Sequence, residues 1–274
     1  MMLFMRIIDY HVHSQHSFDG KNTMEEFCQQ AITLGVTELC FTEHFSVDPK
    51  DVSYDILKTA NYSADIESCQ RSFQGKLIIR KGLEIGEPHL KPYKRNLQCQ
   101  IQPMDLDFII GSIHNINGVK LRLYMQSIDN KYIYQHYFQE IYQMLEQSDI
   151  DALGHLDLMK RYAYEPFGNY DFLQYQDLLE MILKRMIEKN IALEINTSGI
   201  RDSVKETYPA PRVLEFYKKL GGILLTFGSD AHKCTDLASC YADTMKLLLH
   251  LGFKYIFSYK NRQPTAIRID STTL

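Results

Sequence analysis

The chain has 274 residues, of which 45% are hydrophobic, and a formal net charge of −4 at pH 7. This length allows a large buried core, and α/β barrels of this size often form one domain. The sequence has no basic stretch typical of a nucleic-acid-binding protein, and no apolar run long enough to span a membrane. The apolar residues 1–5 are short and run directly into a predicted strand, which argues against a signal peptide.

Six cysteines are present, and none forms a Cys-x-x-Cys pair. This spacing argues against a zinc ribbon or a thioredoxin-like redox motif. Reduced thiols are typical of the cytoplasm, so we expect a cytoplasmic protein. Since the sequence has neither a basic stretch nor a membrane-spanning run, we expect no nucleic-acid or membrane partner.

Strand-like and helix-like patterns alternate along the chain. Apolar runs predict buried strands at residues 6–8, 38–42, 77–83, 108–113, 151–154, 191–195 and 223–229. Helical patterns cover residues 23–35, 54–73, 129–147, 175–189, 211–220 and 235–251, with a capping box at Thr23 and Glu26 and a candidate left-handed cap at Asn190. The alternation predicts right-handed βαβ units and a parallel sheet, and seven units in one domain predict a barrel. The connection over residues 85–107 is expected to be a long basic loop, either solvated or shaping a substrate site.

Residues able to bind metal follow almost every predicted strand. His11 and His13 are two positions apart, so their side chains point the same way. Further candidates follow the other strands: His44, Glu84, His114, His155, Asp230 and His232. The carboxyl ends of the strands of a parallel barrel lie on one face, which carries the active site. Imidazole and carboxylate groups together suit zinc, iron or manganese, so the sequence predicts a metal centre on this face.

These ligands are too numerous for one ion, since a catalytic zinc typically has about three protein ligands. We therefore expect two or three divalent transition-metal ions, with Glu84 suited to bridge two of them. Paired ions activate water and neutralise a phosphoryl group, so the predicted substrate is anionic.

The order of these motifs resembles the PHP (polymerase and histidinol phosphatase) family. The motifs are His11-Val12-His13 followed by Asp19-Gly20, Thr42-Glu43-His44, Gly82-Leu83-Glu84, Gly111-Ser112-Ile113-His114, Gly154-His155 and Ser229-Asp230-Ala231-His232. The resemblance implies one domain over residues 1–274, folded as a distorted (β/α)7 TIM-like barrel with a trinuclear metal centre at its C-terminal face. The chain is too short to include a polymerase.

The resemblance also assigns the ligands to three groups. The groups are His11, His13, Glu84 and Asp230; Glu84, His114 and His155; and Asp19, His44 and His232. His16 is an alternative to Asp19, although the spacing within the family favours Asp19.

Within the family, the chain is most similar to the stand-alone histidinol-phosphate phosphatases. The similarity lies in residues 9–13, 86–89, 154–162 and 196–201. It implies hydrolysis of L-histidinol phosphate in histidine biosynthesis, with Arg161 and Arg201 binding the phosphate. An arginine fork matches phosphate oxygens, although a surface ion pair is the ordinary fate of an arginine. His89 and Glu87 are expected either to meet the amine or imidazole of the substrate or to be structural.

The expected mechanism is attack of a metal-activated water on phosphorus, with Glu84 holding the ions. Asp230 or His232 would supply or relay a proton to the leaving alkoxide. The closest alternative is a PHP-type phosphoesterase for another small phosphate ester or a nucleotide. Two further alternatives are an amidohydrolase-like barrel, for which Lys81 is poorly spaced, and a catalytically inactive metal-binding module.

Overall fold

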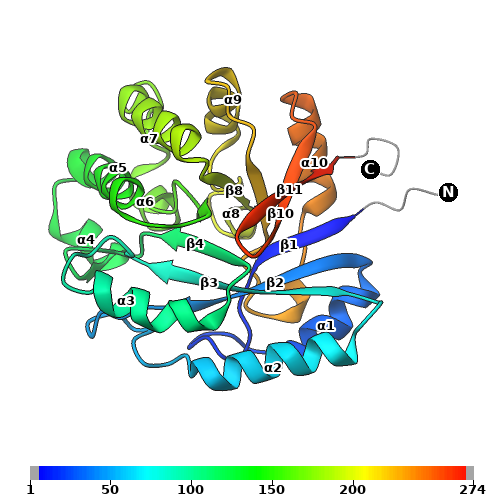
Figure 1. The fold of residues 1–274 in the computed structure, drawn as a ribbon. Helices are drawn as coiled ribbons and strands as arrows, with labels where there is room; N and C mark the ends of the chain where they lie inside the picture. The colour runs from blue at the N-terminus through cyan, green and yellow to red at the C-terminus, as the bar shows by residue number, and fades with distance from the viewer. Residues whose placement is uncertain (1–5, 270–274) are drawn as a thin grey trace.

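The computed structural model describes residues 6–269 of the chain. Seven parallel strands form one sheet, in the order β1–β2–β3–β4–β7–β8–β9, which curves into a nearly closed barrel (Figure 1). The strands are β1 (Ile7–Val12), β2 (Val36–Phe45), β3 (Ile78–Gly86), β4 (Phe108–Ser112), β7 (Ala152–Leu153), β8 (Ala192–Asn196) and β9 (Leu225–Gly228). The predicted parallel barrel of seven strands is confirmed.

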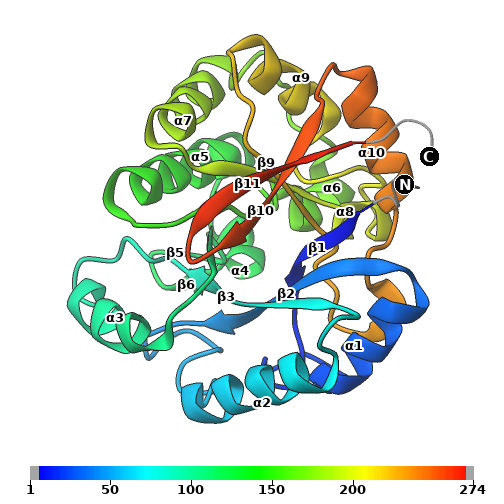
Figure 2. The ribbon, with the colours of Figure 1, turned by 45° about the vertical axis from the view of Figure 1, so that its right-hand side comes forward.

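Helices cover the outside of the barrel (Figure 2). They are α1 (Met24–Thr33), α2 (Thr59–Ser72), α3 (Lys94–Ile101), α4 (Leu121–Ser127), α5 (Asn130–Gln147), α6 (Lys160–Phe167), α7 (Gln176–Lys189), α8 (Ser198–Arg201), α9 (Pro211–Lys219) and α10 (Tyr241–His250). The capping box of Thr23 and Glu26 is present at the start of α1, and Asn190 ends α7 with a φ of 57°. No helix within residues 6–269 is long and apolar enough to span a membrane.

Three predicted segments differ from the structure. The helix expected from residue 54 begins only at Thr59, because residues 51–56 form turns closed by backbone hydrogen bonds. The helix expected from residue 235 begins at Tyr241, after the 3₁₀ turn η2 (Cys234–Asp236). Asp9 accepts a hydrogen bond from the backbone of Ala238, which holds that segment out of a helix. The long loop expected over residues 85–107 contains α3 and the 3₁₀ turn η1 (Gln102–Met104).

The barrel closes weakly between β1 and β9. One parallel bridge joins Val12 to Ala231, just beyond the end of β9. Its hydrogen bonds run from His13 N to Ala231 O at 2.9 Å and from Ala231 N to His11 O at 3.3 Å. This closure lies at the carboxyl ends of the strands, so it holds His11 and His13, at the end of β1, beside the loop that follows β9.

Two small antiparallel hairpins accompany the barrel. One pairs β5 (Asn115–Ile116) with β6 (Val119–Lys120), and the other pairs β10 (Tyr255–Lys260) with β11 (Gln263–Arg268). The β10–β11 hairpin lies against the barrel beside β1 (Figure 2), where Tyr259 N donates to the hydroxyl of Tyr10 at 2.8 Å. Neither hairpin was predicted from the sequence, because a single apolar pattern does not reveal pairing across a tight turn.

Arg262, in the turn of the β10–β11 hairpin, joins the hairpin to the amino end of the barrel. Its guanidinium pairs with Asp149 at 2.8 Å and with Asp151 at 3.0 Å. Asp151 is 8% exposed and also accepts a hydrogen bond from the backbone of Ile109, which begins the pairing of β4 with β7. The ion pair therefore neutralises a buried carboxylate at the base of the barrel.

We expect Arg262→Ala to lower the free energy of unfolding by about 1–3 kcal/mol, because it leaves the Asp151 carboxylate buried without its cation. Urea denaturation measures the change. Arg268→Ala, which removes an exposed arginine from the same hairpin, is the control and should have little effect. Equal stability of the two variants would contradict a role for the Arg262 ion pairs.

Candidate metal centre

The nine predicted ligands meet at the carboxyl ends of the strands. Four overlapping groups have ligand atoms within 4.8 Å of one another: His11, His13 and Asp230; His11, Glu84 and His155; His44, Glu84 and His114; and His13, His44 and His232. Asp19 adjoins the last group. The strands thus collect on one face residues that are far apart in the sequence, as a parallel barrel requires.

Glu84 lies at the centre of the cluster and is 1% exposed. Its Oε1 lies 2.8 Å from His155 Nε2 and 3.3 Å from His114 Nε2. Its Oε2 lies 2.8 Å from His44 Nδ1 and 3.4 Å from His11 Nε2. Burial opposes ionisation of this carboxyl, but the imidazoles of His11, His114 and His44 outweigh burial and hold the pKa of Glu84 well below its usual value. Each oxygen faces a different set of imidazoles, so the side chain has the placement of a bridging ligand.

Asp230 faces His11 and His13, at the carboxyl end of β1. Its Oδ1 lies 3.6 Å from His13 Nε2 and 3.8 Å from His11 Nε2. Asp230 and His155 both have a positive φ, of 53° and 23°, which non-glycine residues adopt infrequently. Such backbone geometry is often found at functional sites, where the surrounding structure holds it in place.

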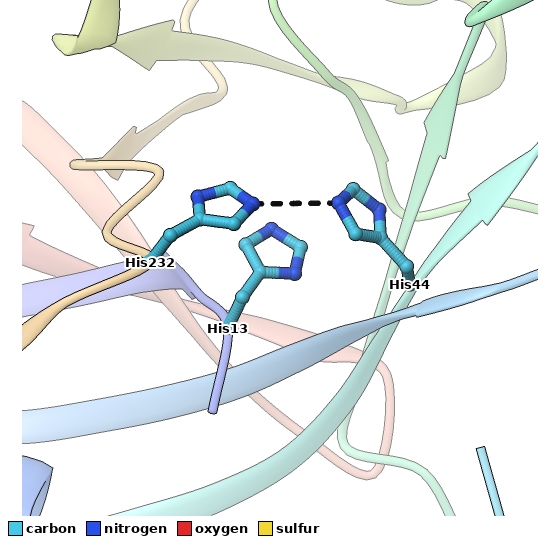
Figure 3. A group of neighbouring side chains, drawn as sticks. All are labelled: His13, His44 and His232. Atoms are coloured by element: carbon cyan, nitrogen blue, oxygen red, sulfur yellow. Dashed lines mark hydrogen bonds between the residues drawn. The ribbon is translucent and has the colours of Figure 1, made fainter. Parts of the chain in front are cut away.

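His13, His44 and His232 form the outer part of the cluster (Figure 3). The rings of His44 and His232 lie on either side of His13, and their Nε2 atoms are 3.4 Å apart. The carboxylate of Asp19 lies 3.3 Å from His232 Nε2 and 3.6 Å from His44 Nε2. His16 instead pairs with Asp65 at 2.9 Å, so the structure brings Asp19, and not His16, to these histidines.

The cluster leaves buried polar atoms without hydrogen-bond partners. Within the described residues, these atoms include His11 Nε2, His13 Nε2, Asp19 Oδ1 and Glu84 Oε2. Unsatisfied buried polar atoms are costly, and here each is a nitrogen or oxygen atom whose lone pair can bind a metal ion. The donor set of imidazoles and carboxylates therefore fits divalent transition metals.

Glu194 is a buried member of the site that the sequence interpretation missed. His11 Nδ1 donates a hydrogen bond to its Oε1 at 2.5 Å, which leaves His11 Nε2 free to ligate. Its Oε2 accepts from the backbone N–H of His155 at 2.6 Å. A Cβ at Gly228 would lie 2.1 Å from Glu194 Oε1, so only glycine permits this approach. Glu194 is on β8, the one barrel strand without a predicted ligand, and it hydrogen-bonds two predicted ligands, His11 and His155, as groups that orient metal-binding imidazoles do.

A cavity of about 920 Å³ opens beside the ligands. Besides ligands, its walls include Phe18, Lys21, Asp51, Val52, Ser53, Asn115, Lys120, Leu121, Arg122, Leu123, Gln126, Leu158, Arg161 and Tyr162. A second cleft, of about 300 Å³, shares Arg161, Asp230 and His232 with it and adds Arg201. Both predicted phosphate-binding arginines therefore lie next to Asp230.

His89 does not line this cavity. Its Nε2 lies 2.8 Å from Glu140 Oε1 on α5, and the residue is only 4% exposed. Glu87 is also buried, and its carboxylate accepts hydrogen bonds from the backbone of His114 and Asn115. Both side chains therefore hold neighbouring segments in place. These contacts favour the structural role for His89 over contact with the substrate.

We expect Glu194→Gln to weaken metal binding about 10- to 100-fold, because the amide removes the charge facing His11 and cannot accept both hydrogen bonds. Competition with a chelator measures the affinity of the metal-depleted protein. Glu188→Gln, an exposed residue on α7 that pairs with Arg185, is the control. Unchanged affinity in Glu194→Gln would refute an orienting role for this carboxylate.

Comparison with known proteins agrees with this geometry. The PHP domain model matches residues 9–198. The chain is 30% identical to histidinol-phosphatase of Lactococcus lactis over 83% of this chain and 85% of that protein. It is 27% identical to a probable histidinol-phosphatase of Thermotoga maritima over 91% of this chain and 94% of that protein.

A solved structure is also similar. The Lactococcus lactis histidinol phosphate phosphatase, determined with Zn, L-histidinol and phosphate, superimposes with a TM-score of 0.84 at 26% identity, and the match covers 96% of this chain and 100% of that one. The ligand motifs, the seven-stranded barrel and the match over residues 9–198 lead to one conclusion. The chain belongs to the PHP family.

Proposed function

We propose that this chain is a metal-dependent phosphomonoesterase that hydrolyses L-histidinol phosphate to L-histidinol and phosphate. The observation that carries the proposal is the convergence of nine side chains able to bind metal beside a cavity that Arg161 also lines. Similarity to a phosphatase whose structure holds Zn, L-histidinol and phosphate supports the choice of substrate. The nine ligands are His11, His13, Asp19, His44, Glu84, His114, His155, Asp230 and His232.

Divalent ions bound by these side chains would activate water and neutralise charge on the phosphoryl oxygens. Arg161 is proposed to bind the phosphate. Its Nε donates to Asp202 at 2.8 Å and its Nη2 to Ser198 at 2.7 Å, so the guanidinium is held in place, and Arg161 lines the cavity. A fixed, planar pair of donors matches two oxygens of a phosphate dianion.

Arg201 is proposed as the second phosphate-binding group. Its guanidinium donates to the backbone oxygen of Ser229 at 2.7 Å and also contacts Ser239. These contacts tie it to the segment that carries Asp230. Asp230 lies 3.4 Å from Arg161 Nη2 and borders both clefts together with His232. Asp230 and His232 are therefore the proposed groups for proton transfer to the leaving alkoxide.

The proposed partner is a small phosphate ester, without nucleic acid or a membrane. The six free cysteines support a reducing location, and we propose the cytoplasm. Another phosphate ester or a nucleotide remains the alternative substrate, because the cavity is larger than phosphate requires. Lys81, the lysine considered for an amidohydrolase-like centre, does not line the cavity.

Purified protein should contain at least two transition-metal equivalents per chain and release phosphate from L-histidinol phosphate faster than from other phosphomonoesters and nucleotides. Elemental analysis and a phosphate assay on the same sample measure both. Chelation should abolish turnover, and added metal should restore it, since the bound metal ions are the proposed means of activating water. Folded, active protein without metal would disprove the proposal.

Arg161→Ala and Arg201→Ala should each lower kcat/KM about tenfold or more, which corresponds to about 1.4 kcal/mol of transition-state stabilisation. Metal content should not change, because a guanidinium does not ligate cations. Lysine at either position should recover little activity, since an ammonium lacks the fork. Inhibition by inorganic phosphate should weaken in parallel. Wild-type phosphate inhibition in both variants would show that the arginines do not bind this group.

A further inference from the structure

Asp51 is a carboxylate in the cavity wall that has no place in the ligand set. The other carboxylates lining the cavity are Asp19, Glu84 and Asp230, and each of them faces imidazoles of the metal centre. Asp51 lies on the segment between β2 and α2, beside Val52 and Ser53, which also line the cavity. Its position calls for an explanation other than metal binding.

The Asp51 carboxylate is held in one orientation. Ser53 N donates to its Oδ1 at 2.7 Å, and Asn115 Nδ2 donates to its Oδ2 at 2.7 Å. The same Asn115 amide donates to Glu87 Oε2 at 2.9 Å, so Asn115 spans two carboxylates and cannot reverse its amide without losing both contacts. This network fixes a negative charge at the cavity wall before any ligand enters.

That charge is not neutralised within the protein. Among the described residues, no Lys, Arg or His nitrogen lies within 4.0 Å of the Asp51 carboxylate. A carboxylate that is fixed, faces a cavity and lacks a cation is suited to bind a cation from outside.

Asp51 is also close to the reaction centre. A Cβ atom placed on Gly86 would lie 3.6 Å from His114 Nδ1 and 4.0 Å from Asp51 Oδ2, so both side chains lie beside this glycine. His114 is a predicted ligand that faces Glu84. Since Gly86 has no side chain, no group from this position stands between the metal centre and Asp51.

We propose that Asp51 binds the protonated amino group of the substrate and selects phosphate monoesters that carry a cation near the ester oxygen. The inference rests on the proposed function and deepens it by naming the substrate class. An ammonium is charged throughout the neutral range, whereas an imidazole of ordinary pKa is mostly neutral there. The fixed carboxylate therefore matches the amine, and Val52, Leu121 and Leu123 provide an apolar wall for the rest of the molecule.

The test compares two substrates in two proteins. The substrates are L-histidinol phosphate and 3-(imidazol-4-yl)propyl phosphate, which lacks only the amine. Wild-type protein should prefer the amine in kcat/KM by about tenfold or more, as expected where a site hydrogen-bonds a substrate group. Asp51→Asn should lose most of this preference while keeping its metal content. Comparing the ratio removes any general effect of the substitution on Asn115, because both substrates meet the same variant.

Asp55→Asn is the matched control. Asp55 lies on the same segment, carries the same charge and pairs with Lys58 at 2.7 Å outside the cavity lining, so its substitution should leave the preference unchanged. A preference that persists in Asp51→Asn, or its absence in the wild type, would overturn the inference while leaving the phosphatase proposal intact. If the wild type does not hydrolyse L-histidinol phosphate, the proposed function fails. O-Phosphoethanolamine against ethyl phosphate then provides the same comparison, and loss of the amine preference in Asp51→Asn alone would still support a cation site.

Discussion

The structure depends on burying one carboxylate, Glu84, among imidazoles. A buried ion without a partner costs several kcal/mol, so the site is stable only if the surrounding groups neutralise it. The barrel meets this requirement by geometry: parallel strands end on one face, and residues at the ends of four other strands reach the same carboxylate. Cations bound between these side chains would replace shared protons with fixed charge. The same positive centre would then attract a phosphate dianion, so stability and substrate class follow from one electrostatic requirement.

The barrel and most of its metal centre were predictable from the sequence. Apolar runs that end in histidine or an acid are informative because both the strand and its end follow from local pattern. The proximity of His44 and Glu84 could be predicted from one rule, that neighbouring parallel strands end on the same face of the barrel. The resemblance to the PHP family added Asp19, and the structure brings Asp19, rather than His16, to His44 and His232.

Features that depend on contacts between distant segments were not predictable. Glu194 looked like an interior residue of an apolar strand, and only the approach of Gly228 and His11 shows that it contacts a predicted ligand. The start of α10 was misplaced because Asp9, far away in the sequence, holds the preceding turn. The sequence left open whether His89 meets the substrate or is structural, because its partner Glu140 comes from the distant helix α5. In each case the deciding interaction joins positions that no short sequence pattern relates.

Because the barrel closes weakly between β1 and β9, the fraction of folded protein should depend on the concentration of free metal. His11 and His13 lie on one side of this closure, and Asp230 and His232 lie on the other. An ion held by both sides would therefore cross-link two segments that are far apart in the sequence. Cross-links that close a long stretch of chain remove the most conformational entropy from the unfolded state in principle. Because the cross-link is reversible, mass action makes the closed barrel more populated as free metal rises. Metal supply would then govern the lifetime of the polypeptide as well as its turnover number.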